Sequence, residues 1–291
     1  PTTAAEPAMS DFIMSMLFSS NPLRALHEIG NQLPETPRMP AVFIGHGSPM
    51  NALEDNAFTK GWKKIGSPIP KPRAILCISA HWETKGSLIT NMAKPKTIHD
   101  FGGFPDALFQ VQYPAPGSPA IAHEIIENIK PALVHEDASW GLDHGCWSVL
   151  KPMFPHADIP VLQLSLDYTK DGPYHFELGK QLRALRNKGI LIIGSGNMVH
   201  NFSYLQLPKA NHATNDMSAL FNQPFAHPWA EEANQSFKDL LVKDNYQALS
   251  NYKSLSKAIQ LAIPTPEHYL PMLYAMACRD RDDHLEFFND I

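Results

Sequence analysis

Four short runs of apolar, β-branched residues recur along this chain, and longer amphipathic stretches separate them. The runs are PAVFIG (Pro40–Gly45), RAILCISA (Arg73–Ala80), IPVLQLSL (Ile159–Leu166) and GILIIGSG (Gly189–Gly196). Runs of this kind, closed by turn residues, are typical of strands that are buried on both faces of a parallel sheet. Their alternation with helical patterns predicts an α/β fold with a mainly parallel or mixed central sheet flanked by helices.

Two of the stretches between the runs carry helix signals. SPAIAHEIIENIK begins with Ser118 as the expected N-cap and Pro119 in the first turn, where its missing N–H costs nothing. Apolar residues recur at helical spacing through residues 173–188, and Gly189 is expected to end that helix. We also expect helices in the polar segment from Asn211 to Ala262.

The chain is long enough for one large core, since 44% of its 291 residues are hydrophobic. We therefore expect a single domain over residues 39–291. Residues 1–38 are interpreted as an N-terminal extension, partly left by processing or cloning, because the chain begins with Pro1. This extension lacks the basic start and the full-length apolar core of a signal peptide.

Charge and cysteine content exclude several classes of function. The net charge is −5 and basic residues form no stripe, so we expect no nucleic-acid partner. No apolar run approaches the roughly 20 residues of a membrane span, so we expect no membrane partner. Three scattered cysteines argue against a thiolate metal site and favour a reducing compartment, which predicts a cytoplasmic protein.

Three histidines follow the predicted strands directly or after a short turn. His46 comes two residues after the run that ends at Ile44, His81 follows RAILCISA, and His200 follows GILIIGSG. If these strands are parallel neighbours, their carboxyl ends meet at the edge where α/β proteins bind ligands. Imidazole is a common ligand of zinc, iron, copper and nickel, so a metal site at this edge is one interpretation. For each histidine alone, a hydrogen-bonded loop or core residue is the other.

Aromatic and acidic residues accompany further histidines. Glu267 and His268 are adjacent in PTPEHYLP, where either could add a ligand, or where Glu267 could simply begin a helix. Aromatic walls around a few polar groups suit a small planar ligand, although aromatic rings also pack ordinary cores. The rings in question are Trp82 beside His81, Phe101 and Phe104 in HDFGGFP, and Trp140 and Trp147 around His144.

Motifs of several other enzyme classes are missing from the sequence. GSGNMV, starting at Gly194, lacks the third glycine of a dinucleotide-binding fingerprint. The chain contains neither G-x-S-x-G nor H-E-x-x-H, although HEIIE at His123 begins like the latter. Serine hydrolases and zincin proteases are therefore disfavoured.

Seven ordered motifs resemble one known family. They are FIGHGSPMNALEDN, ISAHW, TIHDFGGFP, YPAPGSP, WGLDHGCW, GSGNMVHN and PTPEHYLP, and the resemblance around them covers about Met39 to Cys278. Together they resemble the class III extradiol ring-cleavage dioxygenases, in the bacterial and plant branch named for DOPA dioxygenase. The resemblance implies an α/β domain with a metal site at the carboxyl ends of the strands.

The resemblance also implies a set of metal ligands. His46 in G-H-G-S-P and His81 in S-A-H-W correspond to metal ligands of the family. Relatives in the wider superfamily complete the site with a carboxylate late in the chain, and here His268 corresponds to its replacement, with Glu267 as the less favoured candidate. His200 corresponds to the general base and can lie close enough to bind the metal as well.

The implied activity is the opening of a catechol ring by dioxygen. His200 would accept a proton from the catechol, and His144 in D-H-G corresponds to the second acid/base histidine. The cofactor implied is Fe(II), although Zn(II) could occupy the same site. The partners implied are a small aromatic diol and O₂, and either a monomer or a homodimer fits the sequence.

Two other functions fit the same residues. A histidine-rich site without a clear carboxylate ligand also suits a zinc hydrolase, because zinc lowers the pKa of bound water to about 7. A branch of the same superfamily keeps the fold but serves as a metal-containing binding protein without catalysis. The sequence does not distinguish which catechol is used.

Overall fold

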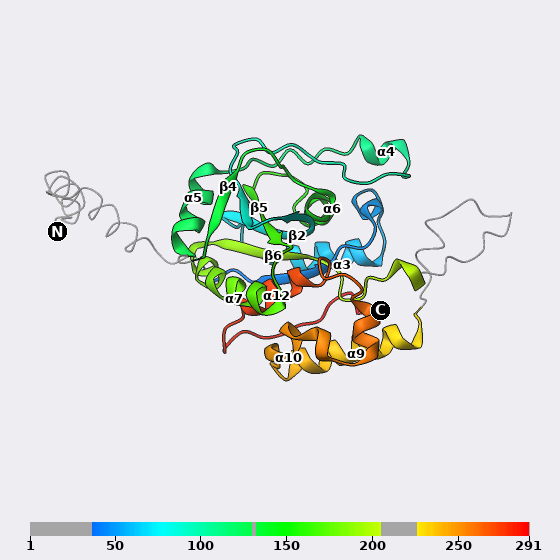
Figure 1. Cartoon of the computed structure of the whole chain (residues 1–291). Helices are drawn as coiled ribbons and strands as arrows, with labels where there is room; N and C mark the ends of the chain where they lie inside the picture. Colours follow the sequence, from blue (N-terminus) through cyan, green and yellow to red (C-terminus); the bar gives the residue numbers. More distant parts are fainter. Residues whose placement is uncertain (1–36, 130–131, 205–225, 291) are drawn as a thin grey trace, which may run out of the picture. The chain divides into compact units, whose positions relative to one another are not determined.

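A mixed sheet of six strands forms the centre of the described part of the chain (Figure 1). The computed structural model describes residues 37–129, 132–204 and 226–290. Across the sheet the strand order is β1-β6-β2-β5-β3-β4. The strands are β1 (Ala41–Gly45), β2 (Ala74–Thr84), β3 (Ser87–Thr90), β4 (Val134–Asp137), β5 (Val161–Asp167) and β6 (Ile190–Gly196).

The four predicted strands are present, and they are parallel neighbours in the order β1-β6-β2-β5. Two further strands, β3 and β4, were not predicted, and they complete one side of the sheet. β3 meets β5 in antiparallel pairing at Ile89 and Leu164, and β4 runs parallel to β3. In β4 only Val134 is buried, so its sequence VHED carries no apolar pattern that could predict a strand.

Helices cover both faces of the sheet, and each face has its own apolar core. Alternate residues of the parallel strands point to opposite faces, so Leu76 belongs to one core and Cys77 to the other. The α-helices are α3 (Ala57–Gly66), α4 (Asp106–Phe109), α5 (Pro119–Asn128), α6 (His144–Met153), α7 (Gly172–Leu182), α9 (Pro228–Val242), α10 (Tyr246–Ser250), α11 (Lys257–Ala262) and α12 (Leu270–Ala277). The 3₁₀-helices are η1 (Pro49–Ala52), η2 (Arg183–Lys188), η3 (Phe202–Tyr204) and η4 (Tyr252–Ser254).

The predicted helix boundaries are confirmed where the structure describes them. Ser118 is the N-cap of α5, and its side chain accepts a hydrogen bond from the N–H of Ile121. The expected helix over residues 173–188 is α7 followed by η2, and it ends at Gly189 in the left-handed conformation with φ of 74°. Of the polar segment 211–262, residues 211–225 lie outside the described residues, and helices α9 to α11 account for most of the rest.

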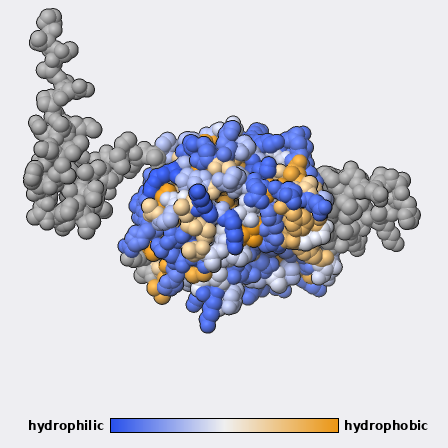
Figure 2. Space-filling view, turned by 90° about the horizontal axis from the view of Figure 1, so that it is seen from above, coloured by the Kyte–Doolittle hydropathy of each residue, from blue (hydrophilic) through white to orange (hydrophobic). Residues whose placement is uncertain are grey.

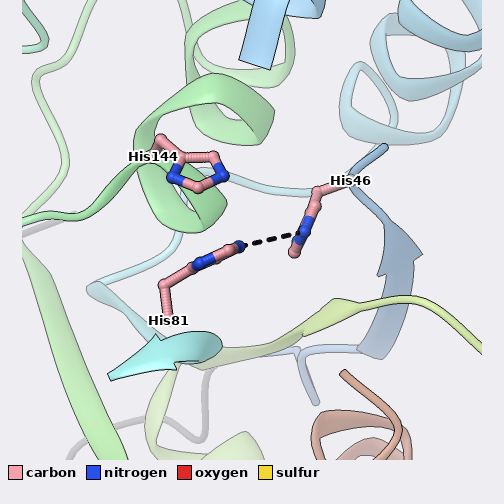
Figure 3. Close-up of side chains that lie close together, drawn as sticks. All are labelled: His46, His81 and His144. Carbon is pink, nitrogen blue, oxygen red and sulfur yellow. Dashed lines mark hydrogen bonds between the residues drawn. The ribbon is translucent and has the colours of Figure 1, made fainter. Parts of the chain in front are cut away.

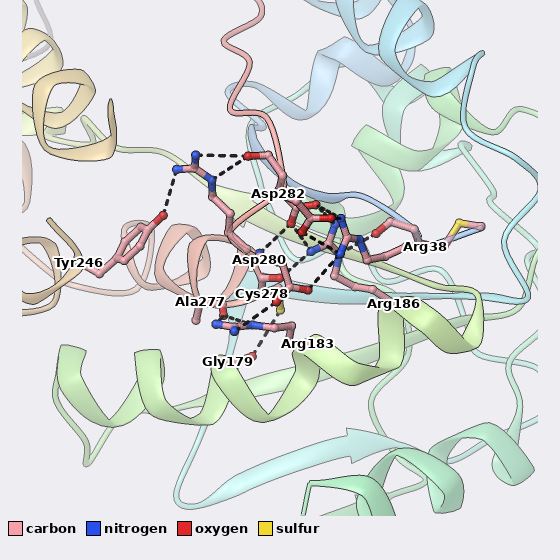
Figure 4. Close-up of polar contacts among 12 residues, drawn as sticks. Arg38, Gly179, Arg183, Arg186, Tyr246, Ala277, Cys278, Asp280 and Asp282 are labelled. Atoms are coloured by element: carbon pink, nitrogen blue, oxygen red, sulfur yellow. Dashed lines mark hydrogen bonds and ion pairs between the residues drawn. The ribbon is translucent and has the colours of Figure 1, made fainter. Parts of the chain in front are cut away.

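Arginines tie the start of β1 to the segment that follows α12 (Figure 4). Arg186 is buried, and its guanidinium donates to the carbonyl oxygens of Met39 and Cys278 at 2.6 and 2.7 Å. It also pairs with Asp283 at 2.5 Å, and Arg38 pairs with the same carboxylate at 3.0 Å. These contacts satisfy the buried charge and hold the first strand in place.

No helix among the described residues is long and apolar enough to cross a membrane. Figure 2 shows that polar side chains cover most of the face it displays. The expected extension of residues 1–38 stays a prediction, because residues 1–36 lie outside the described residues.

Candidate metal centre

Five histidines from separate segments meet at one edge of the sheet. His46 directly follows β1, His81 lies in β2 near its carboxyl end, and His200 follows β6 after a short turn. His144 is the first residue of α6, and His268 lies just before α12. The expected convergence therefore exists, because β1, β6 and β2 are parallel neighbours whose carboxyl ends share this edge.

The local course of β2 differs from the prediction. The strand does not end at Ala80 but continues to Thr84 past an irregularity in its register between Ile78 and Glu83. Such an irregularity redirects side chains relative to a regular strand. His81 lies within this irregular part and points toward His46 and His144 (Figure 3).

The closest contact in the centre joins His46 and His81. Their Nε2 atoms lie 3.2 Å apart, as the dashed line in Figure 3 marks. Potential ligand atoms of His46, His81 and His144 all lie within 4.8 Å of one another. Potential ligand atoms of His200, Glu267 and His268 form a second such group. The structure thus places His144 with the first two predicted ligands, and it places His200 with His268.

Hydrogen bonds fix the tautomer of His46. Its Nδ1 lies 3.0 Å from the hydroxyl oxygen of Ser195, and that hydroxyl donates its own proton to the carbonyl oxygen of Gly145 at 2.6 Å. A serine hydroxyl has one proton, so Ser195 Oγ must accept from Nδ1–H of His46. The Nε2 atom of His46 therefore carries a free lone pair, as a metal ligand requires.

Asp100 has the same effect on His144. Its two carboxylate oxygens accept from the backbone N–H and from Nδ1–H of His144, both at 2.9 Å. Burial raises the pKa of Asp100, but the hydrogen bonds from His144 outweigh it and leave the pKa below its usual value. A carboxylate can only accept, so His144 also keeps a free lone pair on Nε2.

Glu267 has the corresponding role at His268. Its Oε1 accepts from Nδ1 of His268 at 3.1 Å and from the hydroxyl of Thr265 at 2.8 Å. Burial raises the pKa of Glu267, but these hydrogen bonds outweigh it and lower the pKa to about 2. This carboxylate–histidine pair resembles the arrangement that orients imidazole ligands in metal proteins.

Burial disfavours the charged form of three rings of the centre, those of His46, His81 and His200. It lowers the pKa of His46 well below the usual value, and neighbouring imidazoles lower it further. Burial, followed by His144, lowers the pKa of His81 to about 3. Burial, followed by His268, lowers the pKa of His200 to about 4. Neutral imidazole is the form that binds metal ions.

The ring positions are consistent with three ligands around one ion. The ring centroids of His46, His81 and His268 form a nearly equilateral triangle with sides of 5.0, 5.0 and 5.2 Å. An imidazole bound through Nε2 has its centroid roughly 3.2 Å from the metal, so two ligands at angles of about 90–110° have centroids roughly 4.5–5.2 Å apart. Their Nε2 atoms then lie about 3.0–3.4 Å apart, which agrees with the 3.2 Å between His46 and His81.

The other two histidines do not fit the same triangle. The ring centroid of His144 is 3.8 Å from that of His81 and 5.8 Å from that of His46. The ring of His200 stacks on His268 with a centroid distance of 3.5 Å and an angle of 9° between the planes. The distances of 3.8 and 3.5 Å are shorter than the centroid distance between two ligands of one ion, and the distance of 5.8 Å is longer.

Glycines allow the segments that carry the histidines to approach one another. A Cβ atom on Gly196 would lie 2.1 Å from the carbonyl oxygen of His268, and one on Gly194 would lie 2.2 Å from that of Pro271. A Cβ on Gly145 would lie 2.8 Å from the ring of His81. The glycines of GSGNMV therefore serve close packing of the chain against β6.

Sequence reasoning missed the partners of the imidazoles, Asp100 and Ser195. Asp100 lies in the HDFGGFP motif, in which only the aromatic residues were interpreted as possible parts of a ligand site. Of these, Phe101 lies against His144 with a centroid distance of 5.5 Å and against Phe104 at 5.3 Å. Trp147 is fully buried in the core.

Comparison with known proteins identifies the family of this chain. The family described as the catalytic LigB subunit of aromatic ring-opening dioxygenase matches residues 40–290. The 4,5-DOPA dioxygenase extradiol of Escherichia coli K12 is 46% identical over 247 residues, which cover 84% of this chain and 86% of that protein. The protein of the same name from Beta vulgaris is 37% identical over 256 residues, which cover 85% of this chain and 90% of that protein.

A solved structure extends the likeness to the fold. The crystal structure of an uncharacterized protein from Escherichia coli K12 matches with a TM-score of 0.65 and 41% identity. The match covers 84% of this chain and 90% of that one. This chain belongs to the family of the catalytic LigB subunit of aromatic ring-opening dioxygenases.

Proposed function

We propose that this protein is an extradiol dioxygenase that opens the ring of a small catechol with O₂ and a non-haem Fe(II) ion. The family and the two relatives named 4,5-DOPA dioxygenase extradiol support ring cleavage. The observation that carries the metal-dependent part is the triangle of imidazoles at the end of the sheet. Bound Fe(II) supplies redox chemistry between a catechol and dioxygen, which redox-inert zinc does not.

His46, His81 and His268 are the proposed ligands. Their ring centroids are 5.0–5.2 Å apart, and the Nδ1–H groups of His46 and His268 are engaged by Ser195 and Glu267. Glu267 then acts through His268 and is not itself a ligand. Three histidine ligands would leave room at a bound ion for the substrate and dioxygen.

His200 and His144 are the proposed proton-transfer residues. Ionisation of a catechol hydroxyl in the site needs a proton acceptor, and His200, half-buried against His268, would accept that proton. His144 has its Nδ1–H held by Asp100, so its Nε2 is the atom that exchanges a proton with the reacting oxygen. The bond cleaved lies outside the two hydroxyl-bearing carbons, and the product is a ring-opened semialdehyde.

Oxygen consumption by metal-loaded protein tests the proposal. The metal-free protein is loaded anaerobically with Fe(II) or Zn(II) and mixed with a panel of catechols that includes DOPA and protocatechuate. We expect oxygen uptake and a yellow product with iron only. No uptake with either metal, in protein shown to have bound it, would contradict the proposal and favour a zinc hydrolase or a binding protein.

Substitutions test the two classes of residue separately. His81→Ala should abolish metal binding and turnover together, whereas His144→Ala should keep the metal and slow ring opening. His156→Ala is the matched control, because His156 is exposed and lies outside both histidine groups. Turnover by a metal-free His81→Ala variant would remove His81 from the ligand set.

A further inference from the structure

One carboxylate faces two histidines of the centre at once. Asp100 lies in the loop between β3 and α4, and its side chain is 19% exposed. Its Oδ1 accepts from the backbone N–H of His144, and its Oδ2 accepts from Nδ1 of the same residue, both at 2.9 Å. The same Oδ2 lies 3.6 Å from Nδ1 of His81.

We propose that Asp100 is a positioning residue for ring cleavage, which holds His144 in the Nδ1–H tautomer with Nε2 turned toward the site. This inference rests on the proposed function, because it assigns the proton transfer to His144. A carboxylate has no proton to donate, so the two bonds fix both the tautomer and the rotation of the ring. His144 then presents the same nitrogen in every turnover.

The helix itself does not require Asp100 as its cap. Asp143 is the N-cap of α6, and its side chain accepts from the N–H of Cys146 at 3.1 Å. The bond from Asp100 Oδ1 to the backbone of His144 adds to this cap, but the bond from Oδ2 reaches only the imidazole ring. A purely structural role would leave that second bond without consequence for the reaction.

Asp100→Asn separates the two roles. The amide oxygen can still accept from the backbone N–H of His144, but an NH₂ group replaces the oxygen that faces Nδ1. That group can only donate, so His144 should change to the Nε2–H tautomer and lose the lone pair that exchanges protons. We expect kcat to fall by about 10²–10⁴-fold, the range for loss of general acid–base catalysis or for the matching change in serine proteases.

The first measurement is the ¹⁵N NMR spectrum of the metal-free protein, which reports the tautomer independently of activity. The signals of His144 are assigned by their absence in His144→Ala. We expect the Nδ1–H form in the wild type and in Asp100→Glu, which keeps an acceptor, and the Nε2–H form in Asp100→Asn. Asp106→Asn, in the exposed first turn of α4, is the control and should match the wild type.

Activity of the iron-loaded variants then links the tautomer to the reaction. We expect Asp100→Glu to recover much of the lost kcat, and Asp100→Asn to cause no further loss in a His144→Ala background. An unchanged tautomer in Asp100→Asn would overturn the inference, as would unchanged turnover despite a changed tautomer. A large loss of iron affinity in Asp100→Asn would also overturn it, because Asp100 would then act through His81.

Failure of the proposed function can be told apart from failure of this inference. If the wild type opens no catechol with either metal, the dioxygenase proposal fails. The NMR comparison still decides whether Asp100 sets the tautomer of His144. If the wild type is active, the tautomer and the kcat together decide the role of Asp100.

Discussion

Replacing Gly196, the last residue of β6, with alanine should weaken metal binding, because the new side chain would displace His268. A Cβ atom at this position would lie 2.1 Å from the carbonyl oxygen of His268, where real Cβ atoms keep at least 3.0 Å. The backbone of His268 must therefore move by about 0.9 Å, or β6 must move by as much. Misplacement of a site residue by about 1 Å can cost 10²-fold in rate, and overpacking a core costs about 1–3 kcal/mol.

Two other glycines provide the controls for this prediction. Gly194→Ala creates a similar clash, 2.2 Å from the carbonyl oxygen of Pro271, but three residues away from His268. Gly102→Ala meets no atom within 4 Å. Calorimetry should therefore show a lower Tm for Gly196→Ala and Gly194→Ala than for Gly102→Ala. A metal competition titration should show the larger loss of affinity for Gly196→Ala, by at least about tenfold.

If Gly196→Ala binds metal as tightly as Gly102→Ala, the close approach of His268 to β6 does not position a ligand. If Gly196→Ala and Gly194→Ala lose metal affinity equally, the loss reflects general destabilisation of the fold and not the displacement of His268.

Three further predictions concern the ligand partner, the ion-pair cluster and acid stability. Glu267→Gln should weaken metal binding by about 10–100-fold in a chelator competition, and unchanged affinity would remove Glu267 as the partner of His268. Arg186→Met removes the buried partner of Asp283 and the side-chain donor to two carbonyl oxygens, so urea unfolding should show a loss of about 3 kcal/mol; a loss below about 1 kcal/mol would contradict this. Burial lowers the pKa of His175 to about 4, so the folded protein resists the protonation that the unfolded chain accepts below about pH 6.5. Stability should therefore fall between about pH 6.5 and 4 by up to about 3 kcal/mol, and His175→Gln should lose less over this range; an identical pH profile would exclude this origin.

The sequence predicts the strands that are rich in apolar residues. β2, β5 and β6 are mostly buried, and β1 is equally apolar although only Ile44 is fully buried, so each of the four produces a predominantly apolar run. β4 lies at the edge of the sheet with one buried residue of four, and it leaves no such run. Its strand conformation depends on pairing with β3, which no local pattern records.

The candidate site likewise contains residues that the sequence could predict and residues that it could not. His46, His81 and His200 could be predicted from strand ends, because the topology of parallel sheets brings those ends together. His144 and His268 come from a helix start and a loop, where the sequence offered only weak signals, and their roles were expected only from the resemblance to a family. The roles of all five stay predictions.

The partners of the imidazoles were missed for a physical reason. Asp100 is 44 residues away from His144 in sequence, and nothing local distinguishes it from Asp106, six residues further on. Ser195 lies inside an apolar strand, where its hydroxyl gives no signal until Gly145 and His46 are seen on either side. Hydrogen-bond partners that are distant in sequence become visible only when the chain is folded.

These partners also bear on the charge of the proposed centre. Three neutral imidazoles leave a bound dication with its full charge of +2, which a dry site tolerates poorly. Glu267 supplies a negative charge through the Nδ1–H group of His268 and would not occupy a position on the metal. A direct carboxylate ligand would offset the same charge but would use one position. A histidine ligand with a carboxylate behind it would therefore offset part of the charge while leaving room for substrate and dioxygen, which is why substitution of Glu267 should weaken metal binding although Glu267 is not a proposed ligand.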